Sequence, residues 1–185
     1  MDVVPEDILE RRLWVLAQLT NRLAQAGIRP ILVGGTAVAL YTAGSYFTAD
    51  MDIVASNRRL AAQALQEMGF QPEGRHWVHN EWNIAVEIPD TDLAGDPERV
   101  VQVELPDGSC VYCIGVEDLL IDRLNAAVHW RSLEDRRWAK ELLKLHNRSL
   151  DREYLWSRAQ QEGVLGLLNE LQSEVSGTDE EDEVD

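Results

Sequence analysis

The spacing of apolar residues changes along the chain, and each change predicts a different kind of element. Up to Gly69, apolar residues recur every three or four positions and are interrupted by two short apolar runs, which is typical of helices alternating with buried strands. Pro5 suits the first turn of the first helix, and Gly27 suits its end. The predicted order is helix 5–26, strand 30–33, helix 36–43, strand 50–55 and helix 58–68.

The middle of the chain is rich in residues that favour strands. Strands are predicted at 76–78, 83–88, 100–105 and 109–114, and the Pro-Asp-Gly turn at 106–108 predicts a hairpin between the last two. From Val116 the apolar spacing is helical again, with helices predicted at 116–128, 133–146, 151–161 and from Gly163 to about 172. This order predicts an α+β fold followed by a helical C-terminal part.

These patterns divide the chain into three parts. We expect a core at 1–115, a helical part packed on that core at 116–172, and a disordered acidic tail at 173–185. The tail carries seven acids from Glu174 onward and no base. If the tail docks instead, the cationic helix around Arg136 is the candidate place.

Charge and composition narrow the classes of function. The formal net charge of the 185-residue chain is -16, and the body stays acidic when the tail is set aside, which argues against broad binding to nucleic-acid backbones. The N-terminus shows no signal-peptide pattern, and no apolar run is long enough for a bilayer span. Two cysteines make no disulfide framework. We therefore expect a cytoplasmic protein with no membrane partner.

One short stretch combines two features with a chemical use. Gly34 and Gly35 follow a predicted strand and open a helix, where bare backbone and free N–H groups can hold phosphate oxygens, and Thr36 adds a hydroxyl. Asp50 and Asp52 lie two apart on the next predicted strand, so their side chains should share a face. Two adjacent carboxylates repel each other unless a cation lies between them, and a hard divalent ion with oxygen ligands is the usual cation. The alternative is a tight turn and two solvent-facing acids.

The segments "GGTA" and "TADMDIV" resemble the nucleotidyltransferase fold of the DNA polymerase β superfamily, in which Gly-Gly or Gly-Ser opens a helix and Asp-x-Asp lies on the next strand. The chain is most similar to small bacterial nucleotidyltransferases, including AbiE-type toxins, and "GVEDLLIDRLNAAVHW" resembles the first helix after their catalytic sheet. The likeness covers residues 30–140. It implies a mixed sheet, an NTP substrate and Mg²⁺ (or Mn²⁺), with Gly34, Gly35 and Thr36 on phosphates and Asp50 and Asp52 on metal.

The resemblance leads to two hypotheses about function. The first is metal-dependent transfer of a nucleotide from an NTP to a protein, RNA or small-molecule acceptor. The second is a catalytically silent module that binds a nucleotide or a protein partner, such as a toxin–antitoxin component. The chain departs from many relatives in having Tyr46 where they carry an arginine, and no Lys or Arg lies between Pro30 and Val54. A cation for the triphosphate must therefore come from elsewhere.

Further site residues are predicted outside this stretch. A two-ion site needs another carboxylate, and we favour Glu87 over Glu104 because small Ala85 shares its strand face and its strand follows the aspartate strand more closely. Glu87 would then join Asp50 and Asp52 as a metal ligand and catalytic group. Arg123 is the candidate cation for the nucleotide, although for any single arginine of this part a solvated helix face is the favoured explanation. His76 and His79 are expected to be surface or loop residues.

Overall fold

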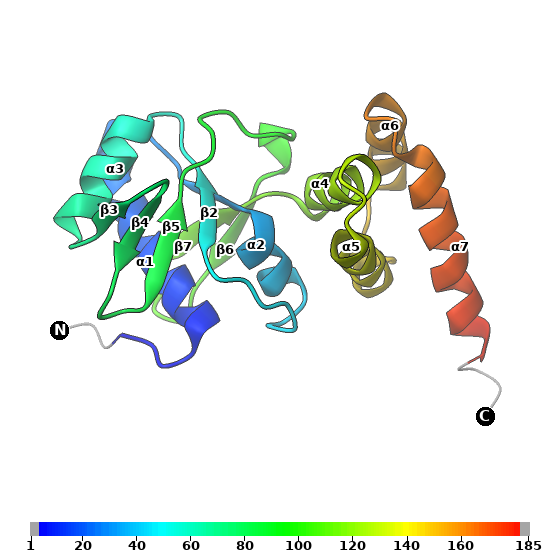
Figure 1. Cartoon of the computed structure of the whole chain (residues 1–185), viewed down its shortest axis with the longest axis horizontal. Coiled ribbons are helices and arrows are strands. Elements are labelled where there is room, and N and C mark those ends of the chain that lie inside the picture. The colour runs from blue at the N-terminus through cyan, green and yellow to red at the C-terminus, as the bar shows by residue number, and fades with distance from the viewer. Residues whose placement is uncertain (1–3, 182–185) are drawn as a thin grey trace. The chain divides into compact units, whose positions relative to one another are not determined.

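The computed structural model describes residues 4–181 and separates the chain into two compact units, Met1–Gly115 and Val116–Asp185 (Figure 1). The first unit contains all the strands found in the described residues, and the second is helical. Each unit is described below by itself.

The first unit is built on a seven-stranded mixed sheet. Its strands are β1 (Ile31–Val33), β2 (Met51–Val54), β3 (Gln71–Glu73), β4 (His76–His79), β5 (Ile84–Glu87), β6 (Val101–Glu104) and β7 (Cys110–Cys113). They lie in the order β3-β4-β5-β2-β1-β7-β6. β2 pairs with β5 in parallel, as does β1 with β7, and the other neighbours are antiparallel. The predicted α+β class and mixed sheet are confirmed.

Three α-helices accompany this sheet, namely α1 (Ile8–Leu23), α2 (Gly34–Tyr41) and α3 (Arg58–Glu67). Two short 3-10 helices, η1 (Ala24–Ala26) and η2 (Pro97–Arg99), complete the unit. α1 passes behind the strands in Figure 1, next to α3. Side chains of Asp7 and Asn57 cap the N-termini of α1 and α3 by accepting backbone N–H bonds, as expected for these residue types.

The core of this unit lies between the sheet and its helices. Leu16 and Leu19 of α1, Leu32 of β1 and Ile53 of β2 are fully buried, as is Phe70 after α3. Burying such side chains stabilises the fold by about 1.5–3 kcal/mol each. The residues that alternate with Ile53 on β2 belong to the other face of the sheet, where the candidate site is found.

Two local details differ from the sequence-based expectation. β2 begins at Met51, so Asp50 precedes the strand and its side chain is placed by a bend rather than by strand alternation. β3 was not predicted from the sequence. Gln71–Glu73 contains a proline and is exposed throughout. It is the outermost strand of the sheet, where proline is tolerated because the free edge of the strand makes no backbone hydrogen bonds to a neighbouring strand.

The second unit consists of α4 (Val116–His129), α5 (Leu133–His146), α6 (Arg152–Gln161) and α7 (Leu165–Glu181). Two buried acids at the start of α4 organise it. Glu117 accepts the backbone N–H of Asp151 at 2.8 Å, just before α6 begins, and Asp118 accepts the hydroxyl of Tyr154 at 2.6 Å. These acids have a structural use within this unit.

The expected disordered tail is wrong for the segment 173–181, because α7 continues through it to Glu181. Val175 is fully buried, and Glu174 binds Arg136 at 2.6 Å and Lys140 at 2.8 Å. Burial of Val175 and the ion pairs of Glu174 with Arg136 and Lys140 therefore offset the conformational entropy that this segment loses when it becomes helical. The acidic composition alone did not indicate these contacts. Residues 182–185 lie outside the described part of the chain.

Within residues 4–181, no helix combines the length and the apolar character needed to cross a membrane.

Candidate functional site

Strand pairing brings carboxylates of separate segments to one place on the sheet. β2 and β5 are parallel neighbours, and their register sets Asp52 opposite Glu87. β4 and β5 are antiparallel, and their register sets His76 opposite Glu87. Residues that face each other in this way lie on the same face of the sheet. The sheet therefore gathers side chains of β2, β4 and β5 on one face.

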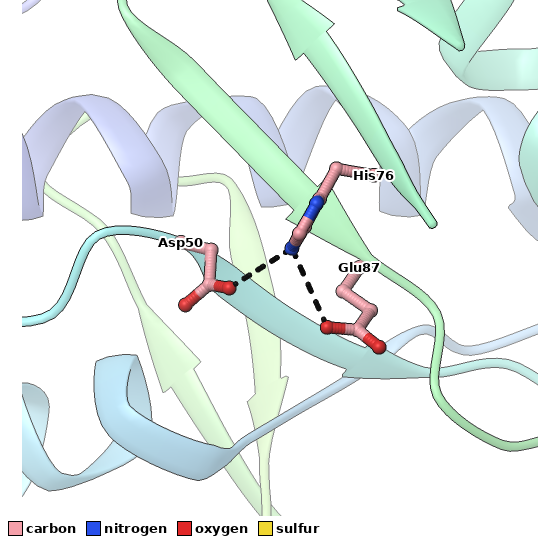
Figure 2. Close-up of side chains that lie close together, drawn as sticks. All are labelled: Asp50, His76 and Glu87. Carbon is pink, nitrogen blue, oxygen red and sulfur yellow. Dashed lines mark hydrogen bonds and ion pairs between the residues drawn. The ribbon is translucent and has the colours of Figure 1, made fainter. Parts of the chain in front are cut away.

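Asp50, His76 and Glu87 form a tight group there (Figure 2). His76 Nε2 lies between the two acids, 3.2 Å from Asp50 Oδ2 and 3.5 Å from Glu87 Oε2. One ligand atom from each residue lies within 4.8 Å of the other two. The side chains are 26%, 28% and 14% exposed for Asp50, His76 and Glu87, so the group is accessible to a small ion or to substrate.

Protein cations already contact these carboxylates. Arg75 Nε lies 3.2 Å from Glu87 Oε2, the same oxygen that His76 approaches. The Arg75 side chain is 72% exposed, so it can swing away at little cost. Thr48 Oγ1 donates to Asp50 Oδ1 at 3.3 Å, which fixes the second oxygen of that carboxylate.

Asp52 lies against the start of α2. Gly34 has φ +61°, and a Cβ added to it would stand 2.3 Å from Asp52 Oδ2. The glycine is therefore needed both for its left-handed backbone and for the room that the carboxylate takes. The residue before the helix, Val33, provides no side-chain cap, and the carboxylate of Asp52 lies beside the first turn of α2.

Gly35 and Thr36 have structural partners instead of an open face. A Cβ on Gly35 would lie 2.8 Å from Thr48 and 2.9 Å from the ring of Tyr46, which explains the second glycine. Thr36 is fully buried, and its hydroxyl donates to the carbonyl of Asp50 at 2.9 Å. Both residues hold the segment that carries Asp50 in place.

A cation that the sequence did not reveal stands next to this segment. Arg12 of α1 is only 5% exposed and donates to Thr36 Oγ1 at 3.3 Å and to the carbonyl of Thr48 at 2.9 Å. Burial lowers the pKa of Arg12, while the charges of Asp50 and Asp52 raise it. Its Nε is buried without a hydrogen-bond partner among the described residues. Arg12 thus supplies positive charge near both aspartates and ties α1 to the site.

A cavity of about 310 Å³ adjoins the site within the first unit. Arg12 and Thr48 line it, together with Glu10, Tyr46 and Phe47. Phe47 is 87% exposed, although aromatic rings are costly to leave in water. Thr48 lines this cavity and also donates to Asp50, so it lies between the cavity and that carboxylate.

Two other residues considered from the sequence lie elsewhere. Glu104 is exposed on β6, at the far edge of the sheet, with β1 and β7 between it and β2. Arg123 belongs to α4 in the second unit, where it contacts Asp122 at 2.5 Å and Asp135 at 2.8 Å. Within the first unit, the described structure groups Asp50 with Glu87, sets Asp52 opposite Glu87 and keeps Glu104 apart from them, whereas the ion pairs of Arg123 lie within the second unit.

His76, His79 and Arg12 show what pattern reading missed. His76 was expected on the surface, but the β4–β5 register carries it to Glu87. His79 stacks on Trp82 with ring centroids 3.7 Å apart, and burial lowers its pKa. Arg12 is a charged residue on the apolar side of α1, between apolar positions, and that break in the helical pattern was the available signal.

Neither a protein-family model nor a curated protein matches this chain. Among solved structures, it is similar to an antigenic nucleotidyltransferase-like protein from Paracoccidioides brasiliensis, with a TM-score of 0.57 and 17% identity over 91% of this chain and 94% of that one. The solution structure of the antibiotic-resistance factor ANT(2'')-Ia gives a TM-score of 0.53 and 11% identity over 92% and 97%. The chain therefore has the fold of nucleotidyltransferase-like proteins.

A crystal structure of ANT(2'')-Ia in complex with adenylyl-2''-tobramycin gives a TM-score of 0.49 and 12% identity over 88% of this chain and 98% of that one.

Proposed function

We propose that this protein transfers a nucleotide from an NTP to an acceptor and that the reaction needs a divalent cation. One observation carries the proposal: the carboxylates of Asp50 and Glu87 lie within 4.8 Å of each other, on the sheet face where Asp52 lies against the glycine start of α2. A place for metal and a place for phosphates are thus adjacent. The fold, which resembles nucleotidyltransferase-like proteins, is the expected frame for such a site.

The residues present fit a metal ion. Asp50 and Glu87 offer oxygen atoms within 4.8 Å of each other, Asp52 is the register partner of Glu87, and carboxylate oxygens are the ligands that Mg²⁺ and Mn²⁺ accept. Asp50, Asp52 and Glu87 would hold the ion. A bound ion of this kind activates an attacking hydroxyl and neutralises phosphate charge.

The chain itself binds and orients the reactants. The first N–H groups of α2, beside Gly34, would direct their partial positive charge at phosphate oxygens. Arg12 keeps the three-residue segment from Thr48 to Asp50 in place. In the reaction, an acceptor oxygen forms a bond to the α-phosphorus, the bond from that phosphorus to the bridging oxygen breaks, and pyrophosphate leaves with its electron pair. The acceptor proton passes to a carboxylate of the site, for which Glu87 is our choice.

The acceptor is assigned by class only. The cavity lined by Tyr46, Phe47 and Thr48 has room for a small molecule or for a side chain of a protein, and an aromatic wall suits either. The net charge of -16 disfavours a large RNA unless a partner supplies positive charge.

Incubation with each labelled NTP, Mg²⁺ or Mn²⁺ and cell extract tests the proposal directly. Label should appear on an acceptor with wild-type protein and should be absent with Asp50→Asn plus Asp52→Asn. Calorimetry should show that NTP binding needs divalent metal and is lost in the same double variant while its unfolding remains cooperative. Equal NTP binding by wild type and double variant contradicts the assignment of the aspartates.

A matched pair of variants tests the third carboxylate. Glu87→Gln should abolish transfer, because it removes a charge from the group around Asp50. Glu104→Gln changes an exposed acid on the edge strand of the same sheet and should leave transfer unchanged. Loss of transfer in Glu104→Gln with full transfer in Glu87→Gln would move the role to Glu104.

The second hypothesis, a catalytically silent nucleotide- or partner-binding module, is favoured by one specific observation. Arg75 lies at ion-pair distance from Glu87 and can supply positive charge there without a metal, and His76 lies within reach of both acids. Metal-independent NTP binding without transfer to any acceptor would select this function. A protein partner, such as the second component of a toxin–antitoxin pair, would then carry the activity.

A further inference from the structure

We propose that His76 is itself a metal ligand, so that Asp50, His76 and Glu87 form a mixed oxygen and nitrogen site that prefers Mn²⁺ to Mg²⁺. This inference rests on the proposed function, because the bound ion would serve nucleotide transfer. Its test is independent of that function, because it measures the binding of Mn²⁺ and Mg²⁺ without NTP. It concerns a residue that the sequence pattern assigned to the surface and that the sheet brings to the acids.

The positions of the three ligand atoms suit a single ion. Ligands about 2.1 Å from an ion lie about 3.0 Å apart at the octahedral angle and about 3.4 Å apart at the tetrahedral angle. His76 Nε2 is 3.2 Å from Asp50 Oδ2 and 3.5 Å from Glu87 Oε2. Two of the three separations thus have ligand spacing already, and the third is within 4.8 Å. Rotation of the Asp50 or Glu87 side chain would bring the third pair of ligand atoms to the same spacing.

The backbone holds the imidazole in this place. His76 opens β4 and faces Glu87 across the antiparallel β4–β5 pair, so its position is set by ladder bonds rather than by a loop. Figure 2 shows the Nε2 side of its ring turned toward both carboxylates.

The chemistry of the ligands determines the choice of ion. Mg²⁺ takes oxygen ligands almost exclusively and keeps much of its water, whereas imidazole nitrogen suits first-row transition ions. An imidazole added to these carboxylates therefore favours Mn²⁺ over Mg²⁺. Removing the imidazole should lower the affinity for Mn²⁺ and leave the affinity for Mg²⁺ nearly as it was.

The test compares metal binding by full-length wild type, His76→Gln and His129→Gln. His129 is exposed on α4 in the second unit and provides a matched control for loss of one histidine. In calorimetry with Mn²⁺ or Mg²⁺ alone, wild type and His129→Gln should prefer Mn²⁺. His76→Gln should bind Mn²⁺ at least about tenfold more weakly, as expected when a ligand or its support is removed.

Pulsed EPR of the Mn²⁺-loaded wild type gives a second readout that does not depend on a variant folding. Nitrogen modulation from a directly bound imidazole should be present in wild type and in His129→Gln and absent in His76→Gln. No nitrogen modulation in wild type, or equal Mn²⁺ affinity in His76→Gln, would overturn the inference.

The outcomes separate this inference from the proposed function. Mn²⁺ binding through His76 without any transfer of label supports the metal site and contradicts the transferase. Transfer that depends on Asp50 and Glu87, with no nitrogen bound to Mn²⁺, supports the transferase and contradicts His76 as a ligand.

Discussion

Alanine at Gly34 would test the contact that links the glycine turn to Asp52. The substitution adds one methyl group at φ +61°, in the left-handed region, and aims it at Asp52 Oδ2, 2.3 Å from the new Cβ. Real Cβ atoms do not approach an oxygen this closely, so either the carboxylate or the start of α2 must move. We therefore expect Gly34→Ala to lose both stability and metal binding.

The expected loss of stability has two parts. The left-handed backbone costs a non-glycine residue about 1–2 kcal/mol. Turning Asp52 away from its present rotamer costs about 1 kcal/mol more. The free energy of unfolding should therefore fall by about 2–3 kcal/mol in Gly34→Ala.

Gly27→Ala is the matched control. Gly27 has φ +69°, and a Cβ added there meets no atom within 4 Å. It carries the backbone penalty alone, about 1–2 kcal/mol. In urea unfolding followed by tryptophan fluorescence, Gly34→Ala should be less stable than Gly27→Ala by about 1 kcal/mol, which corresponds to about 2–4 °C in Tm for a chain of this size. Mn²⁺ and Mg²⁺ binding should weaken in Gly34→Ala only.

Two double-mutant cycles, each combining one glycine variant with Asp52→Ala, measure the clash between the new Cβ and the Asp52 carboxylate. Without that carboxylate, Gly34→Ala should lower the free energy of unfolding by less, whereas Gly27→Ala should lower it by the same amount as before. The effects of the two substitutions should therefore be non-additive for Gly34 and additive for Gly27. If the two glycine variants lose the same stability and both cycles are additive, Asp52 does not occupy the space beside Gly34 and the reasoning is refuted.

Three further experiments test other parts of the chain. Arg12→Met should lower the free energy of unfolding by about 2 kcal/mol, because two hydrogen bonds from a buried charged side chain are lost. The control Arg22→Met, on the exposed end of α1, should change the free energy of unfolding little, and equal effects of the two substitutions would contradict the role of Arg12. Burial raises the pKa of Cys113 to about 12, so a thiol reagent at pH 8 should label Cys110 alone until the protein unfolds, and equally fast labelling of both would show that Cys113 is not buried. Val175→Ala should cost about 2 kcal/mol in chemical unfolding of the full chain, and no loss would mean that this turn of α7 does not pack.

Local signals in the sequence were sufficient for most of the fold. Helical spacing of apolar residues, caps such as Asn57 and the Pro-Asp-Gly turn depend on neighbours within a few positions, so they can be read from a linear chain. Their limits appear where context overrides composition. The acidic segment after Ser173 forms part of α7 because Val175 and Glu174 find partners, and no local pattern contains those partners.

The linear pattern already identified the residue types that could make the site: two glycines before a helix, and Asp50 and Asp52 two positions apart. Which side chains lie together follows from the folded sheet and not from that pattern. Sheet order places β5 beside β2 and β6 at the far edge, so Glu87 lies near Asp50 and Glu104 does not. It also brings His76 and Arg12 to the acids from segments that are distant in sequence. Spacing along a chain encodes faces and turns, whereas proximity between strands depends on their pairing, which is a property of the whole sheet.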